Sequence, residues 1–302
     1  MNKKFVFIGM LISVVHTSCN KDKNLLNTNQ NKDTITEITY TNDPDYVLSN
    51  KNAQELIEHL ENEQKALLQK LKIVNRKEAE DLYLEHYRKV TVIVDSLNKA
   101  EINTLKLYHQ FQNNKPDSVL QKEEIYDKVN LYFRKIDSNL YDFRIKPGYF
   151  ANLFQNKVSP EYREYMKLRH QEHTNAYEAQ LTNEKITLEQ HRELLILWEK
   201  FINKYPNFKF IDYAKRSYTE HLTLYLFGSS TNPTFEISTK KLYVENEQEY
   251  ISFMKKYPKT TTAEITKDYL KHFYENDKNF TAEEFYIDLK NYIKKIISEK
   301  VK

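Results

Sequence analysis

The stretch Trp198-Glu-Lys-Phe-Ile-Asn-Lys-Tyr-Pro206 recurs in weaker form after 52 residues (250 − 198) as Tyr250-Ile-Ser-Phe-Met-Lys-Lys-Tyr-Pro258. In both copies, aromatic and aliphatic residues follow the 3.6-residue period of a helix. The Tyr-Pro step predicts the end of each helix, because the proline ring disfavours α geometry at the residue before it. A second amphipathic segment follows each stop. The sequence therefore predicts a helix, a Lys-Tyr-Pro stop and another helix, occurring twice.

This pattern resembles a known type of helical repeat. The Phe-Ile-x-Lys-Tyr-Pro-Asn motif, with Ala214 in the aromatic-rich segment after it, is similar to the hairpins of tetratricopeptide-type proteins, in particular those of bacterial outer-membrane assembly lipoproteins. The resemblance covers Thr187 to Glu275. It implies stacked helical hairpins, although the interval of 52 residues exceeds the usual ~34. We expect the loop Gly228-Ser-Ser-Thr-Asn-Pro233 to account for the extra length.

Met1 to Cys19 has the layout of a secretory signal. A short basic start is followed by an apolar run from Phe5 to Val15, which is too short to span a bilayer. The segment ends in a sequence that resembles the lipobox of bacterial lipoproteins, with His16 in place of the usual aliphatic residue. Because Cys19 is the single cysteine of the chain, we expect it to carry palmitate and to attach the protein to a membrane.

The residues after Cys19 bear on location. Asn20 differs from the aspartate that resembles an inner-membrane retention signal, so we expect a lipid anchor in the outer membrane. Lys21-Asp22-Lys23 resembles the charged tracts that send some lipoproteins to the cell surface, and a solvated linker explains it equally well. The periplasmic and surface orientations both stay open.

The sequence predicts four parts and an all-α fold. Residues 1–18 form the signal peptide, and 19–50 form a flexible tether, because Asn, Thr, Asp and Lys dominate there and bury too little apolar surface to offset chain entropy. Residues 51–145 are expected to form an antiparallel helical bundle. Residues 146–302 are expected to form the hairpin domain that resembles a repeat protein.

Apolar stripes define the helices of the predicted bundle. One helix is expected over 53–74 and a long one over 78–111, followed by a break at Asn113-Asn-Lys-Pro-Asp117. Asp117 is expected to cap a third helix, whose face consists of Ile125, Val129, Tyr132, Phe133, Ile136 and Leu140. The segment 141–158 is predicted to be a long break and a hinge between the two halves.

Capping signals support the later helices. Ser159 is expected to cap a helix with Pro160 at its first position. Three pairs fit the capping-box pattern and predict helix starts, namely Thr187 with Gln190, Thr261 with Glu264, and Thr281 with Glu284. The terminal helix is expected to reach Ile296.

Composition and motifs give little support for catalysis. The formal charge is +3, or +1 without Lys3 and Lys4, so we expect no nucleic-acid partner. No phosphate-binding loop, nucleophile elbow or standard metal spacing occurs, so no catalytic residue, metal or cofactor is expected. The closest cluster to a metal site is His170, Glu172 and His173, with His191 further along. His170 and His173 share a helix face and would hold a metal only with a third ligand from Glu189 or His191, and two surface histidines on a charged helix explain the cluster better.

Two functions are compatible with these features. The first is a non-catalytic scaffold, anchored in the envelope, that binds another envelope protein through stacked helix pairs. The alternative is a surface lipoprotein that binds a glycan or nutrient. The 23 tyrosines suit either ligand recognition or the core, and their helical spacing favours the core.

Overall fold

A computed structural model describes residues 48, 51–108, 110, 115–137, 140–182, 186–229, 232–275 and 280–301. The signal peptide, Cys19 and nearly all of the tether lie outside these residues, so the expectations for them stay predictions. Val47–Lys302 forms one compact unit.

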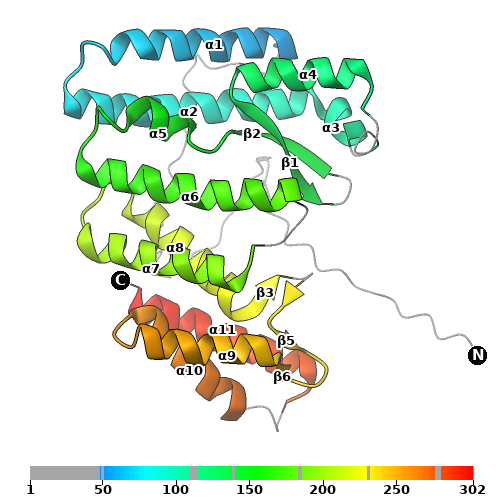
Figure 1. Ribbon diagram of the computed structural model, residues 1–302, viewed down its shortest axis with the longest axis vertical. Coiled ribbons are helices and arrows are strands. Elements are labelled where there is room, and N and C mark those ends of the chain that lie inside the picture. The colour runs from blue at the N-terminus through cyan, green and yellow to red at the C-terminus, as the bar shows by residue number, and fades with distance from the viewer. Residues whose placement is uncertain are drawn as a thin grey trace, which may run out of the picture. The chain divides into compact units, whose positions relative to one another are not determined.

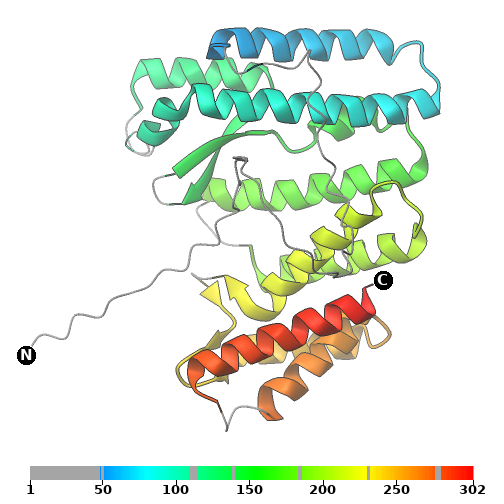
Figure 2. The same cartoon turned by 180° about the vertical axis from the view of Figure 1, so that it is seen from behind.

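The first half of this unit consists of helices and one hairpin. Its elements are α1 (Ala53–Lys70), α2 (Arg76–Ala100), α3 (Ile102–Tyr108), α4 (Asp117–Lys128), β1 (Leu131–Asp137), β2 (Leu140–Ile145), α5 (Tyr149–Phe154) and α6 (Pro160–Thr182). Figure 1 shows α1, α2 and α6 as successive, roughly parallel rods, and Figure 2 shows the same order from behind.

The second half contains five helices and four two-residue strands. They are α7 (Leu188–Lys204), α8 (Ile211–Phe227), β3 (Gly228–Ser229), β4 (Asn232–Pro233), β5 (Phe235–Glu236), β6 (Lys241–Leu242), α9 (Val244–Lys256), α10 (Thr261–Glu275) and α11 (Ala282–Lys300). Within the described chain, strands pair only in three two-stranded hairpins. The predicted all-α class is therefore confirmed. No helix in the described residues is both long enough and apolar enough to cross a membrane.

The prediction of a third bundle helix is wrong beyond Lys128. There α4 ends, and Asn130 turns the chain with a φ of 61°. From Leu131 the chain is extended, and Phe133 faces Phe143 across the β1–β2 ladder. The sequence Leu-Tyr-Phe-Arg fits two patterns equally well, the alternation of apolar and polar residues in a strand and the apolar period of a helix. The left-handed turn and the cross-strand aromatic pair decide in favour of the hairpin.

The predicted break over 141–158 is also wrong. It contains most of β2 and the whole of α5, and only short connections lie between the elements. Gly148 makes the turn into α5 with a φ of 85°, a left-handed conformation that glycine adopts without strain. The expected long helix over 78–111 is interrupted at Glu101, which separates α2 from α3. Asp117 is the first residue of α4 and not its cap, since Pro116 occupies that position without a side-chain hydrogen bond.

The two Tyr-Pro stops have nearly identical geometry. Tyr205 has φ −128° and ψ 60°, and Tyr257 has φ −129° and ψ 51°. In each case the tyrosine N–H donates to the carbonyl of the phenylalanine four residues earlier, Phe201 or Phe253, at 2.9 Å. Helix, stop and helix therefore occur twice, as the sequence predicts.

The repeated stripes face the core, as predicted. The side chains of Trp198, Phe201, Tyr250 and Phe253 are all at most 1% exposed. The stripes on the second helices are buried as well, namely Ala214, Tyr218 and Leu222 on α8, and Ile265, Tyr269 and Phe273 on α10. One apolar cluster extends from Leu67 to Ile297 and includes residues from both sides of position 145. The division into domains at 145 and 146 stays a prediction.

Two of the three predicted capping boxes are confirmed. Thr187 with Gln190 and Thr281 with Glu284 each exchange both capping hydrogen bonds. At α10 the prediction is wrong, because Thr260 caps the helix by accepting from the Ala263 N–H at 3.1 Å. Pro160 is the first residue of α6, as expected, but the Ser159 hydroxyl has no hydrogen-bond partner among the described residues.

Candidate functional site

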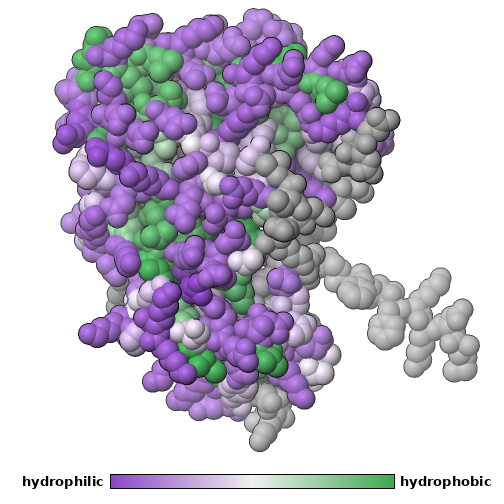
Figure 3. Space-filling view, viewed as in Figure 1, coloured by the Kyte–Doolittle hydropathy of each residue, from purple (hydrophilic) through white to green (hydrophobic). Residues whose placement is uncertain are grey.

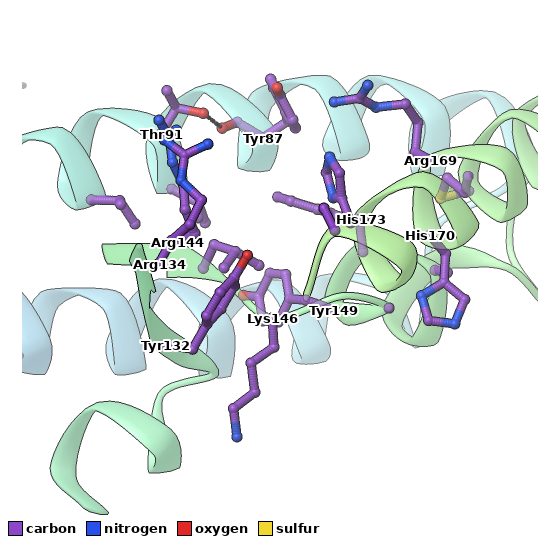
Figure 4. Close-up of a pocket in the computed structure, with 18 of the residues that line it drawn as sticks. Tyr87, Thr91, Tyr132, Arg134, Arg144, Lys146, Tyr149, Arg169, His170 and His173 are labelled. Atoms are coloured by element: carbon purple, nitrogen blue, oxygen red, sulfur yellow. Dashed lines mark hydrogen bonds between the residues drawn. The ribbon is translucent and has the colours of Figure 1, made fainter. Parts of the chain in front are cut away.

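A cavity of about 350 Å³ lies between α2, the β1–β2 hairpin, α5 and α6. Figure 4 shows its side chains converging from these elements. Its lining is rich in aromatic rings and cationic side chains, which include Tyr83, Tyr87, Tyr132, Tyr149, Phe150, Tyr165, Arg134, Arg144, Lys146 and Arg169. A second pocket on the hairpin, lined by Tyr108, Tyr141, Lys115 and Lys135 among others, also combines rings and charges. We take the cavity beside α2 as the candidate site because three arginines line it.

Regular spacing brings these side chains to one place. On α6, Arg169 and His173 are four residues apart and therefore share a face. On the hairpin, Tyr132 and Arg134 point to one side of the strand, and Arg144 is the cross-strand partner of Tyr132. The opposite side of the hairpin carries the buried Phe133. The hairpin thus places its polar face toward the cavity and its apolar face in the core.

Carboxylates hold the arginines in place. Asp142 accepts two hydrogen bonds from Arg134, at 2.9 and 2.7 Å, and also lies 2.9 Å from Nη2 of Arg144. Glu172 accepts from Nη1 of Arg169 at 2.6 Å, and the same nitrogen contacts the Ser217 hydroxyl at 3.1 Å. Such pairing reduces the rotational freedom of each guanidinium, so less entropy is lost when a ligand binds.

Lys146 takes a different direction. Its ammonium group pairs with Asp127, and in Figure 4 its side chain extends away from Arg144 and Arg169. The three arginines, and not this lysine, are therefore the cations that a bound ligand would meet.

Two histidines at the cavity are neutral at neutral pH. Desolvation, followed by the charge of Arg169, lowers the pKa of His173 to about 4. The ring is still open to the cavity space, where Figure 4 shows it between the arginines. Burial likewise lowers the pKa of His86 to about 4. His86 Nε2 lies 2.8 Å from the Tyr149 hydroxyl and fixes that ring in the cavity wall.

The residues considered as metal ligands are not brought together. His170 packs near Gly148, His173 faces the cavity, and Glu189 pairs with Arg192. Glu172 and His191 do approach each other, but through His221, which the sequence analysis missed. Across the residues that the structure describes, no group of three or more His, Cys, Asp or Glu side chains is arranged to hold a metal.

The missed histidine belongs to a buried polar chain. His221 Nε2 lies 2.8 Å from Glu172, and His221 Nδ1 lies 3.0 Å from Nδ1 of His191. Burial would raise the pKa of Glu172, but its hydrogen bond to His221 and the charge of Arg169 lower it below the ordinary value. Desolvation lowers the pKa of His191 to about 4. This series of hydrogen bonds fixes Glu172, which in turn pairs with Arg169. Helices α7 and α8, which carry the two histidines, therefore help to orient a cavity side chain on α6.

No known protein family, characterised protein or solved structure matches this chain. The interpretation of the cavity therefore depends on its own geometry.

Proposed function

We propose that this protein binds a small molecule in the cavity between α2, the hairpin, α5 and α6. The observation that carries this proposal is a cavity of about 350 Å³ that combines aromatic walls with positioned polar groups. Ligand sites usually have volumes of about 300–1,000 Å³ and combine apolar surface with a few fixed polar groups. At ~30 Å³ per water, the cavity holds about twelve waters, which leaves room for a monosaccharide or a small aromatic compound.

We further propose that binding occurs without catalysis. Thr91 carries the only aliphatic hydroxyl in the described lining, and it donates to the Tyr87 carbonyl at 2.9 Å. This hydrogen bond directs the hydroxyl proton to the backbone and not to a general base. The arrangement suits recognition, which makes the nutrient- or glycan-binding function the better supported of the two.

Replacing Tyr87 with alanine is expected to weaken binding of a cavity ligand at least tenfold. The ring is half-buried, lines the cavity and contacts Phe150 at a centroid distance of 5.3 Å, so its loss opens one wall. Binding of monosaccharides and small aromatic compounds to the mature chain would be measured by calorimetry. Tyr274→Ala is the matched control, because Tyr274 is half-exposed on α10 and does not line the cavity. Equal weakening by both variants, or no binding of any compound, would contradict the proposal.

We also propose that the protein is an outer-membrane lipoprotein anchored through Cys19. The signal layout and the single cysteine support this proposal. Cys19→Ala is expected to abolish palmitate labelling and to move the protein out of the detergent phase. Wild-type labelling of the mutant would refute it, and Cys19→Ser provides a second variant with a side chain closer in size.

An interaction scaffold is the second candidate. Val244 and Ile251 lie seven residues apart on α9 and are 64% and 39% exposed. Glu247 lies between them and accepts from the hydroxyl of Tyr274, which is also exposed. Figure 3 shows a mostly hydrophilic face with several apolar areas. Exposed apolar side chains that lie together suit contact with a partner protein. The resemblance to tetratricopeptide hairpins of assembly lipoproteins supports this candidate, and an empty cavity in the calorimetric experiment would favour it.

A further inference from the structure

We infer that the cavity selects a small molecule carrying a carboxylate, and that Arg144 and Arg169 bind this group. The inference rests on the proposed binding function and specifies the chemical class of the ligand. In Figure 4, the two guanidinium groups approach the cavity from opposite sides, with Tyr87 and His173 between them. An anionic group placed there would lie in the field of both guanidinium charges.

The hairpin contributes an excess of positive charge. Arg134 and Arg144 share one carboxylate, that of Asp142, which already accepts two hydrogen bonds from Arg134. Asp142 therefore compensates one of the two cations. The Arg144 side chain is 46% exposed. A second carboxylate, from a ligand, would complete a balanced set of two guanidinium groups and two acids.

Arg169 has donors to spare. Its Nη1 is used by Glu172 and Ser217, whereas Nε and Nη2 have no hydrogen-bond partner within the described chain. Because His221 Nε2 also donates to Glu172, this carboxylate is held from two sides and keeps Arg169 in place. A guanidinium that is fixed at one edge and open at the other suits a planar carboxylate, which can accept two parallel N–H bonds.

Counting Asp95, three carboxylates balance the three arginines, so the site offers open N–H donors and not a net positive charge. Asp95 is the carboxylate of the described lining, and it is engaged in an interaction of its own. Desolvation is the main cause that lowers the pKa of His173, and the charges of Arg169 and Arg144 add to it while Glu172 opposes it, so both arginines act on the middle of the cavity. A neutral His173 ring can hydrogen-bond to a ligand without adding charge.

The aromatic walls suit a ring in the rest of the ligand. Tyr83 and Phe150 meet edge to face at 5.9 Å, and Tyr165 adds another ring from α6. Rings of this kind stack on the apolar face of a sugar or on an aromatic group. The shared chemistry is a ring that bears a carboxylate, either a sugar acid or an aromatic acid.

The test uses two pairs of probes that differ mainly in the acid. D-glucuronate is compared with D-glucose, and benzoate with benzyl alcohol, by calorimetry on the mature chain at ~0.15 M salt, where distant charges are screened. We expect the acid of at least one pair to bind tenfold or more tightly than its neutral partner, which corresponds to about 1.4 kcal/mol. A preference for the acid in only one pair supports the inference and shows whether the ligand ring is a sugar or an aromatic group.

Variants connect the preference to the two arginines. Arg169→Met and Arg144→Met are each expected to reduce the preference for the acid at least fivefold. Arg144 is exposed on β2, so its variant stays informative if Arg169→Met fails to fold. Arg169→Lys keeps the charge but loses the planar fork, and should retain only part of the preference. Arg88→Met is the matched control, since Arg88 is exposed on α2 and lies outside the lining.

The measurements distinguish a failure of this inference from a failure of the proposed binding function. If each neutral probe binds as tightly as its acid, the inference is wrong and the proposed binding function stands. If none of the four probes binds, the inference and the proposed function fall together. An equal loss of preference in Arg88→Met would assign the effect to overall charge and would also overturn the assignment to Arg144 and Arg169.

Discussion

Replacing Trp198 with alanine is expected to lower the free energy of unfolding by about 3–5 kcal/mol, the usual cost of truncating a large buried aromatic side chain. Its side chain is fully buried. Its ring lies 5.9 Å from Tyr165 and 6.0 Å from Phe201 in edge-to-face contacts, so truncation leaves a cavity between α6 and α7. Urea unfolding followed by far-ultraviolet circular dichroism would measure the change.

Trp198→Phe is the informative control. The indole Nε1 is buried without a hydrogen-bond partner among the described residues. Phenylalanine therefore removes an unsatisfied donor while it keeps most of the ring, and we expect a loss of about 1–2 kcal/mol. An unchanged midpoint for Trp198→Ala would contradict the assignment of this residue to the core. A simultaneous loss of partner binding would then indicate an exposed recognition tryptophan.

The features that the sequence predicted correctly are set by local chemistry. A Tyr-Pro step ends a helix through a clash between adjacent residues. This rule applies equally at Tyr205 and Tyr257, which adopt the same backbone angles. The boxes at Thr187 and Thr281 likewise need only residues within one turn. Such signals can be read from a single stretch of chain.

The errors arise where distant residues decide. Apolar spacing alone allowed either a helix or a hairpin over 131–145, and the pairing of Phe133 with Phe143 resolves it. The start of α10 is another case, because Glu199 on α7 accepts from the N–H groups of Thr261 and Thr262. No pattern in the α10 sequence reveals that partner.

The cavity belongs to the same class of features. Its arginines come from α6 and from a hairpin that was expected to be helical. The supporting His221 lies on α8 between Glu220 and Leu222, and its role depends on Glu172 of α6. The alternation of Tyr132 and Arg134 was the one available signal. It gains meaning only once the strand is known, because a helix would place these two side chains on different faces.

The second large effect is expected at Glu199, whose carboxylate on α7 caps α10 from a distance. Its two oxygens accept from the Thr261 N–H at 2.6 Å, and from the Thr262 N–H and hydroxyl at 3.0 and 2.6 Å. Because the Thr262 hydroxyl donates to Glu199, the Tyr218 hydroxyl at 2.8 Å must donate to Thr262. One buried carboxylate thus connects α7, α8 and α10, and its charge also suits the positive end of the α10 dipole.

Glu199→Ala is therefore expected to lower the free energy of unfolding by about 2–4 kcal/mol, since buried N–H groups lose their acceptors and each unsatisfied group costs about 1–3 kcal/mol. Glu199→Gln keeps one acceptor oxygen and should lose about half as much. Glu193→Ala on the same helix is the control, and because Glu193 is exposed, its effect should stay within about 0.5 kcal/mol. Urea melts would give the three values, and amide hydrogen exchange should show the largest loss of protection at Thr261 and Thr262. Equal stabilities for the Glu199 and Glu193 variants would show that the start of α10 does not depend on the Glu199 carboxylate. Apolar packing would then be the interaction that joins the two hairpins.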